Sequence, residues 1–143
     1  MSAPKDQQQM QILSAIPVLE VADVEASIDW YREMLDFTAD PFPQTPPFQF
    51  AILRQGETEL MLRCGTPNVL REPQPYQWNV YLRLAGGELQ DLFTRLSDRS
   101  VVSRRLERMF YGLAEFEIAD PDGYVVCLSE ELHDAGDLPT PAV

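Results

Sequence analysis

The chain has 143 residues, of which 45% are hydrophobic, enough for one globular domain or two small modules that share a core. Its 23 acidic and 11 basic residues give a net charge of −12, which disfavours nucleic-acid binding and favours a cationic ligand. No apolar run approaches the ~20 residues of a membrane span, and the polar start MSAPKDQQQM is no signal peptide, so we expect a cytoplasmic protein with no membrane partner. Cys64 and Cys127 lie far apart without CxxC spacing, which indicates reduced strand residues.

The first half of the chain predicts a strand, a helix and three more strands. The strand-like segment IPVLEVAD (16–23) leads into a helix from Val24 to about Leu35, for which Asp23 is a suitable N-cap. One face of this helix is apolar at helical spacing, so it packs on a sheet. Strand patterns follow at 38–42, 48–54 and 58–63, the last two joined by a tight turn.

The second half repeats the first. NVYLRLAG (79–86) aligns with IPVLEVAD and again leads into a helix, here over about 88–98. DPDG (120–123) supplies the turn before the last strand. The proline-rich stretch 71–77 suits a linker between the halves. Strand patterns in this half cover 101–109, 114–119 and 124–130.

This order predicts an α+β fold in which two βαβββ modules pair into a curved eight-stranded sheet around a cleft. We expect residues 1–143 to form a single domain. Its parts are module one over 12–70, module two over 77–131, and an acidic flexible tail over 132–143.

Three segments occur in an order and at a spacing that together are specific: AIPVLEVADVEASIDWYREMLDF (15–37), GETELMLRC (56–64) and FYGLAEFEIADPDGYVVCLSE (110–130). Over roughly residues 12–131 the sequence resembles the vicinal oxygen chelate superfamily, which includes glyoxalase I, extradiol dioxygenases, and bleomycin and fosfomycin resistance proteins. The resemblance implies the paired βαβββ fold, a ligand site in the cleft and a homodimer. It is closest to the metal-free, bleomycin-resistance-like branch.

The resemblance also implies where a metal would be held, because metal-binding members place His, Glu, His and Glu on the first and last strands of the two modules. By register these positions fall on Ile16, Met61, Asn79 and Cys127, with a one-residue alternative at Asn79. Isoleucine cannot coordinate, and a thioether or an amide replaces imidazole and carboxylate poorly. The single histidine, His133, lies beyond the last strand. We therefore expect no metal, no cofactor and no catalytic residue.

Strand alternation sorts the other side chains onto two faces. Leu60 and Leu62 should pack under the first helix, while Arg63 faces the cleft and pairs either with a ligand anion or with a neighbouring glutamate. Of the aromatic residues, we expect Phe48, Phe50 and Phe110 in the core, and Trp78 and Tyr111 either at the cleft rim or in the core. The predicted ligand-binding cleft comprises Met61, Arg63, Trp78, Asn79, Tyr81, Tyr111 and Cys127.

Two main functions remain open at this point. The first is a metal-free homodimer that binds a small organic molecule, such as a cationic antibiotic or another toxic compound. The second is a superfamily lyase, isomerase or dioxygenase-like enzyme with a non-standard site, for which Glu20 or Glu59 would have to act as acid or base. A third and weaker alternative is an interaction module that uses the acidic C-terminal tail.

Overall fold

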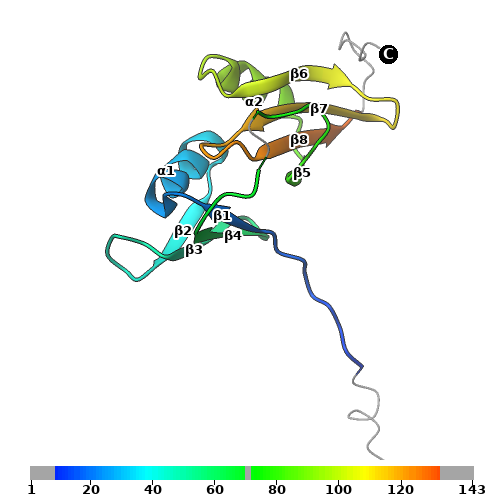
Figure 1. Ribbon diagram of the computed structural model, residues 1–143. Helices are drawn as coiled ribbons and strands as arrows, with labels where there is room; N and C mark the ends of the chain where they lie inside the picture. Colours follow the sequence, from blue (N-terminus) through cyan, green and yellow to red (C-terminus); the bar gives the residue numbers. More distant parts are fainter. Residues whose placement is uncertain (1–8, 70–71, 133–143) are drawn as a thin grey trace, which may run out of the picture.

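The computed structural model describes residues 9–69 and 72–132 (Figure 1). Module one contains β1 (Val18–Val21), α1 (Val24–Leu35), β2 (Thr38–Phe42), β3 (Phe50–Gln55) and β4 (Thr58–Cys64). Module two contains β5 (Val80–Leu84), α2 (Leu89–Ser97), β6 (Val102–Arg108), β7 (Leu113–Ala119) and β8 (Val125–Glu131). Both modules have the βαβββ order, as the sequence predicts. No helix in the described ranges is both long and apolar enough to cross a membrane.

Each module forms its own four-stranded sheet, in the order β1-β4-β3-β2 for the first and β5-β8-β7-β6 for the second. In both sheets the first strand of the module pairs in parallel with its last strand, and the other pairs are antiparallel. The predicted fold of two βαβββ modules is confirmed. Its eight strands form two separate sheets, which Figure 1 shows as two layers at an angle to each other.

Local signals account for α1. The side chain of Asp23 accepts a hydrogen bond from the backbone N–H of Ala26, which satisfies a free donor at the first turn. The helix ends at Leu35, and its C-cap, Asp36, has a left-handed φ of 61° and donates its N–H to the carbonyl of Arg32. The apolar face, which includes Ile28 and Tyr31, is buried against sheet one.

The predicted sorting of strand faces holds in the first sheet. Leu60 and Leu62 are fully buried beneath α1, and Met61 between them points to the other face and is half-buried. In the second sheet the pattern differs, because β7 and β8 are buried on both faces along nearly their whole length. Something other than α2 must therefore cover the cleft face of this sheet.

The DPDG turn joins module two to module one. Asp120 is buried and accepts a hydrogen bond of 2.8 Å from the hydroxyl of Tyr31 on α1. Its other oxygen accepts from the backbone N–H groups of Asp122 and Tyr124, both at 2.9 Å. Asp122 in turn accepts from the N–H of Ala22. Figure 1 shows this β7–β8 turn, in orange, beside α1. The motif that the sequence identifies as a turn thus also holds the modules together.

A second contact links the two helices. Arg95 of α2 donates hydrogen bonds to the carbonyls of Glu33 and Met34, which lie in the last turn of α1. Free carbonyls at a helix C-terminus attract a cation, so this contact also satisfies the end of α1. The DPDG turn and the helix pair together set how the two sheets face each other.

Candidate ligand-binding site

A groove of about 410 Å³ lies where the two modules meet, between residues 14–17, the start of β4 and β5. Ile16, Glu59, Asn79, Tyr81 and Arg83 are among the residues that line it. Its volume is within the range of known small-molecule pockets. Two of the four positions implied for a metal, Ile16 and Asn79, line this groove. Of the seven predicted cleft residues, Asn79 and Tyr81 line it and the other five do not.

Next to the groove, the concave face of the second sheet carries a buried cluster of charges. The guanidinium of Arg104 on β6 bonds to Glu117 at 2.6 Å, to Glu115 at 2.9 Å and to Glu107 at 2.9 Å. The side chains of Glu115 and Glu117 are 0% and 1% exposed, and that of Arg104 is 6% exposed. Buried charges are tolerated only when they are paired and hydrogen-bonded, and here one cation is shared by three carboxylates.

Aromatic side chains donate the remaining hydrogen bonds to this cluster. The hydroxyls of Tyr81 and Tyr111 donate to Glu115 at 2.6 and 2.5 Å, and the indole N–H of Trp78 donates to Glu117 at 2.8 Å. Burial, followed by the bond to Glu115, raises the pKa of both Tyr81 and Tyr111 above the usual tyrosine value. Both phenols therefore remain donors at neutral pH.

Two more features complete the cluster. Burial acts to lower the pKa of Arg104, but its bonds to Glu107 and Glu117 outweigh this and raise it, so the guanidinium stays charged. The ring of Tyr76 lies over this guanidinium, with 4.3 Å between its centroid and the Arg104 Cζ, in a cation–π contact. The cleft face of sheet two is thus filled by the protein's own side chains.

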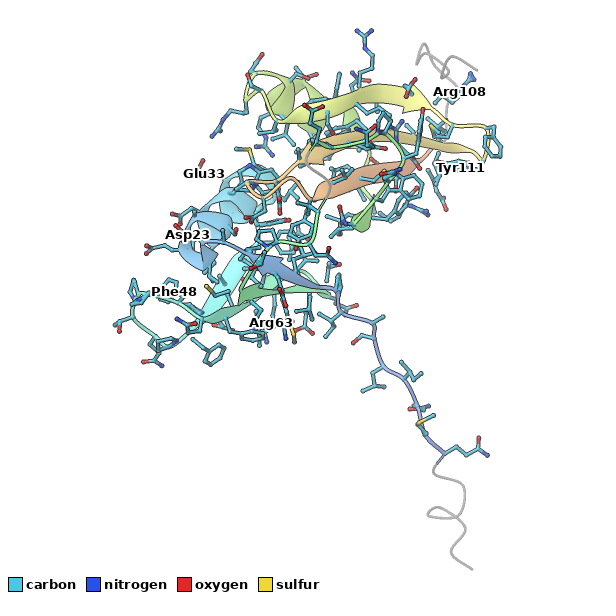
Figure 2. All side chains as sticks on the ribbon, in the orientation of Figure 1. Asp23, Glu33, Phe48, Arg63, Arg108 and Tyr111 are labelled. Carbon is cyan, nitrogen blue, oxygen red and sulfur yellow. The ribbon has the colours of Figure 1, made fainter. Side chains whose placement is uncertain are left out.

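The sequence-predicted cleft residues divide into two groups in space. Trp78, Tyr81 and Tyr111 gather around Glu115 and Glu117, and Cys127 lies between Tyr81 and Glu117 in the strand register. Met61 and Arg63 lie on sheet one. Figure 2 shows Arg63 in the lower module and Tyr111 at the far end of the upper one.

Arg63 has a partner within its own sheet. It forms an ion pair with Glu20, which is one of the two alternatives that the sequence leaves open. Its side chain is 59% exposed, so a ligand anion can still reach it. The central positions of this face are otherwise apolar, with Val18, Met61 and Ile52 aligned across three strands. Sheet one therefore presents an apolar centre on this face, with the exposed ion pairs of Arg63 and Arg54 beside it.

The four positions implied for a metal do not suit one. Ile16 has no donor atom, and the Oδ1 of Asn79 already accepts a hydrogen bond of 2.9 Å from the N–H of Val125. Cys127 is fully buried, and burial, followed by the nearby Glu115, raises the pKa of its thiol. Within residues 9–69 and 72–132, no three His, Cys, Asp or Glu side chains converge as a metal site requires. His133 lies outside the described residues.

Sequence reasoning missed the charged cluster. The stretch Glu115-Phe116-Glu117-Ile118 alternates acidic and apolar residues, which places both acids on one face of β7. That alternation could have identified Glu115 and Glu117 as cleft residues. Nothing local indicates that Arg104 reaches them, because β6 carries bulges where it pairs with β7.

The prediction for Phe110 is wrong. We expected it in the core, but it is 96% exposed because it lies in the tight turn between β6 and β7, where Gly112 has a positive φ of 83°. Phe48 and Phe50 are half-buried, and Phe48 packs against the core. Trp78 and Tyr111 are 39% and 41% exposed, so neither lies in the core, and neither lines the groove.

The family model of the Glyoxalase/Bleomycin resistance protein/Dioxygenase superfamily matches residues 15–128. The chain therefore belongs to this superfamily. No curated protein matches the chain by sequence.

Several solved structures have a similar fold. A glyoxalase/bleomycin resistance protein/dioxygenase from Alicyclobacillus acidocaldarius is 16% identical in sequence, with a TM-score of 0.67. The match covers 84% of this chain and 92% of the Alicyclobacillus chain. A glyoxalase-related enzyme from Clostridium phytofermentans is 14% identical with a TM-score of 0.67, covering 88% and 100%. TioX from Micromonospora sp. ML1 is 18% identical with a TM-score of 0.64, covering 82% and 97%. At these identities the likeness concerns the fold alone.

Proposed function

We propose that this protein binds a small organic cation in the groove between its modules, without a metal, and acts by sequestering that molecule. The observation that carries the proposal is the groove itself. Two of the positions implied for a metal line it, and it has the volume of a small-molecule site, yet the side chains at those two positions are poor donors. The sequestered molecule would be an antibiotic or another toxic compound.

Charge supports a cationic ligand. Two acids, Glu57 and Glu59, line the groove with one cation, Arg83, and the chain carries a net charge of −12. Tyr81 lines the same groove and offers an aromatic face for a flat ligand. The ring of Tyr81 already faces the guanidinium of Arg83, with 5.7 Å between the ring centroid and Cζ, so a cation can contact an aromatic surface here.

Calorimetry on chelator-treated, dialysed protein tests this function. Bleomycin and a panel of aromatic amines and amidines are the ligands, and matched carboxylates are the controls. We expect at least one cation to bind with micromolar or better affinity and the carboxylates not to bind. If none of the cations binds while the protein remains folded, the proposal fails.

A pair of variants locates the binding. Ile16→Trp places a large side chain in the groove and should weaken binding at least tenfold, because Ile16 lines its wall. Gln90→Trp is the control, since Gln90 is exposed on α2 and does not line the groove. Equal affinity in both variants would place the ligand elsewhere.

The enzymatic alternative is tested by elemental analysis and by turnover of glyoxalase- and dioxygenase-type substrates. Tightly held stoichiometric metal that restores turnover after stripping and re-addition would favour it over sequestration. We expect neither result, because the metal positions offer no suitable set of donors.

We further propose that the protein is a homodimer. Large apolar side chains are exposed on the N-terminal segment and on the open face of sheet one. They are Met10 at 89%, Ile12 at 82%, Leu13 at 89%, Val18 at 49% and Phe42 at 48% exposure. Such surface is commonly covered by a partner. Sedimentation velocity at micromolar concentration measures the mass, and a single species of 16.3 kDa would contradict the proposal.

A further inference from the structure

We propose that residues 72–78 form a lid over the cleft face of sheet two, and that its release enlarges the ligand site. These residues, called the strap below, lead from module one into β5. They cover the buried charges of Arg104, Glu115 and Glu117 described above, and they explain why β7 is buried on both faces. The inference builds on the proposed function, because it concerns how a ligand enters the same site.

The strap is held to the sheet mainly through one carboxylate. Glu117 accepts the backbone N–H of Tyr76, at 3.1 Å for the shorter contact, and the indole N–H of Trp78 at 2.8 Å. The hydroxyl of Tyr76 adds a long contact of 3.5 Å to Glu107. Among the described residues, the only backbone–backbone hydrogen bond of the strap is internal, from Gln77 to Gln74 at 3.3 Å. Segments held in this way open locally at low cost.

The backbone of the strap favours release. Tyr76 has a φ of 65°, a left-handed conformation that is strained for a residue with a large side chain. Its ring contact with Arg104 and its N–H contact with Glu117 hold it in that conformation. When these contacts are lost, the residue can return to an unstrained backbone.

A groove lies on each side of the strap's C-terminal end. One is the groove of about 410 Å³ lined by Tyr81 and Asn79, and the other, of about 330 Å³, is lined by Trp78, Asn79 and Val125. Asn79 is common to both, and the ring of Trp78 lies 4.7 Å from that of Tyr81, measured between centroids. Movement of Trp78 would therefore join the two grooves and expose Glu117.

The chemistry of the released site defines the ligand that would open it. Glu117 loses two N–H donors when the strap leaves, so the replacing group should be a planar cation with two N–H donors, such as an amidine. The rings of Tyr81 and Trp78 would then contact an adjoining flat part of the ligand. A bulky amidine needs both grooves, whereas a small one fits a single groove with the strap in place.

Hydrogen exchange measured by NMR tests the lid without any ligand. We expect the amide of Tyr76 to exchange at least a hundredfold faster than that of Phe116, which lies in the centre of β7. Trp78→Phe keeps a ring but removes the indole donor, and it should speed exchange at Tyr76 about tenfold without affecting Phe116. Trp30→Phe, on α1, is the matched control and should change neither rate. Equally slow exchange at Tyr76 and Phe116 in all three proteins would overturn the lid.

Ligand titration then tests its role in binding. Pentamidine, a bulky bis-amidine, should bind Trp78→Phe about tenfold more tightly than the wild type. The reason is that opening the strap costs less free energy once the indole hydrogen bond is absent. Benzamidine, which is small enough for the groove lined by Tyr81 and Asn79 alone, should bind the two proteins equally, because Trp78 does not line that groove. Glu117→Gln should weaken pentamidine binding, because its anchor has lost its charge.

The outcomes separate this inference from the proposed function. If pentamidine binds the wild type and Trp78→Phe equally while Tyr76 stays protected, the strap is no lid, although the proposed cation site stands. If neither amidine nor any other cation binds, the proposed function and the role of the strap in binding fail together. In that case the exchange rates at Tyr76 still decide whether the strap opens.

Discussion

Replacing Arg104 by methionine tests whether the charged cluster is as buried and as interdependent as its geometry indicates. Methionine keeps much of the apolar volume of the arginine stem but removes the guanidinium. The three ion pairs of Arg104 are lost together, and Glu115 and Glu117 are left as carboxylates at 0% and 1% exposure with no cation. The tyrosine and tryptophan donors remain but carry no compensating charge.

The expected cost follows from this burial. Removal of one partner from a buried ion pair typically costs about 3–5 kcal/mol, since an uncompensated charge remains in the interior. Domains of this kind have a free energy of unfolding of about 5–15 kcal/mol, so the Arg104→Met variant should lose a large part of its stability. Arg63→Met is the matched control. Its ion pair with Glu20 is on the surface, at 59% and 37% exposure, and should be worth less than about 1 kcal/mol.

Urea denaturation followed by circular dichroism measures both variants. Urea is uncharged and leaves the electrostatics unscreened, unlike guanidinium chloride. Adding Glu117→Gln should recover part of the loss at pH 7. A cost below about 1 kcal/mol would show that water reaches the cluster, and would refute the reasoning.

Three further predictions concern the module contact and the cysteines. Tyr31→Phe removes the hydroxyl that donates to buried Asp120 at 2.8 Å and should cost about 1–3 kcal/mol in the same denaturation assay, and an unchanged midpoint would contradict this. Burial raises the pKa of Asp120 above its ordinary value of 3.8, so the stability associated with this group is full below pH 3.8 and is lost as the pH rises through the raised value. Asp120→Asn should remove that component from the pH dependence of unfolding, and parallel curves for the two proteins would disprove it. Cys64 is exposed and Cys127 is buried with a raised thiol pKa, so Ellman's reagent should titrate one thiol per folded chain at pH 8 and two in urea. Two fast thiols in the folded protein would contradict the burial of Cys127.

Local patterns were sufficient for much of the fold. The cap at Asp23, the spacing of apolar residues in α1 and the alternation around Met61 each depend on neighbours within a few positions. The predicted strands were correct to within about two residues at their ends, as expected when ends are set by pairing. The family resemblance and the internal repeat then ordered these elements into two βαβββ modules.

The site depended on contacts between distant parts of the chain. The sequence predicts that Trp78, Tyr81 and Tyr111 lie near a cleft. It does not predict that their hydrogen-bond donors converge on Glu115 and Glu117. The sequence also could not decide whether Arg63 pairs with a ligand anion or with a neighbouring glutamate, since either anion would neutralise the guanidinium charge. Phe110 is apolar and was predicted to be buried, but the turn that exposes it forms only when β6 and β7 pair.

The sequence by itself determined the order of elements, the faces of the strands and the residue types at the four positions implied for a metal, because these depend on residue type and short-range periodicity. The tertiary structure alone decided that the cleft face of sheet two is filled by Arg104 and covered by residues 72–78. It also decided that the open groove lies at the junction of the modules. The physical reason is that pairing of buried charges is set by three-dimensional distance, and Arg104 and Tyr76 reach Glu117 only after the chain has folded.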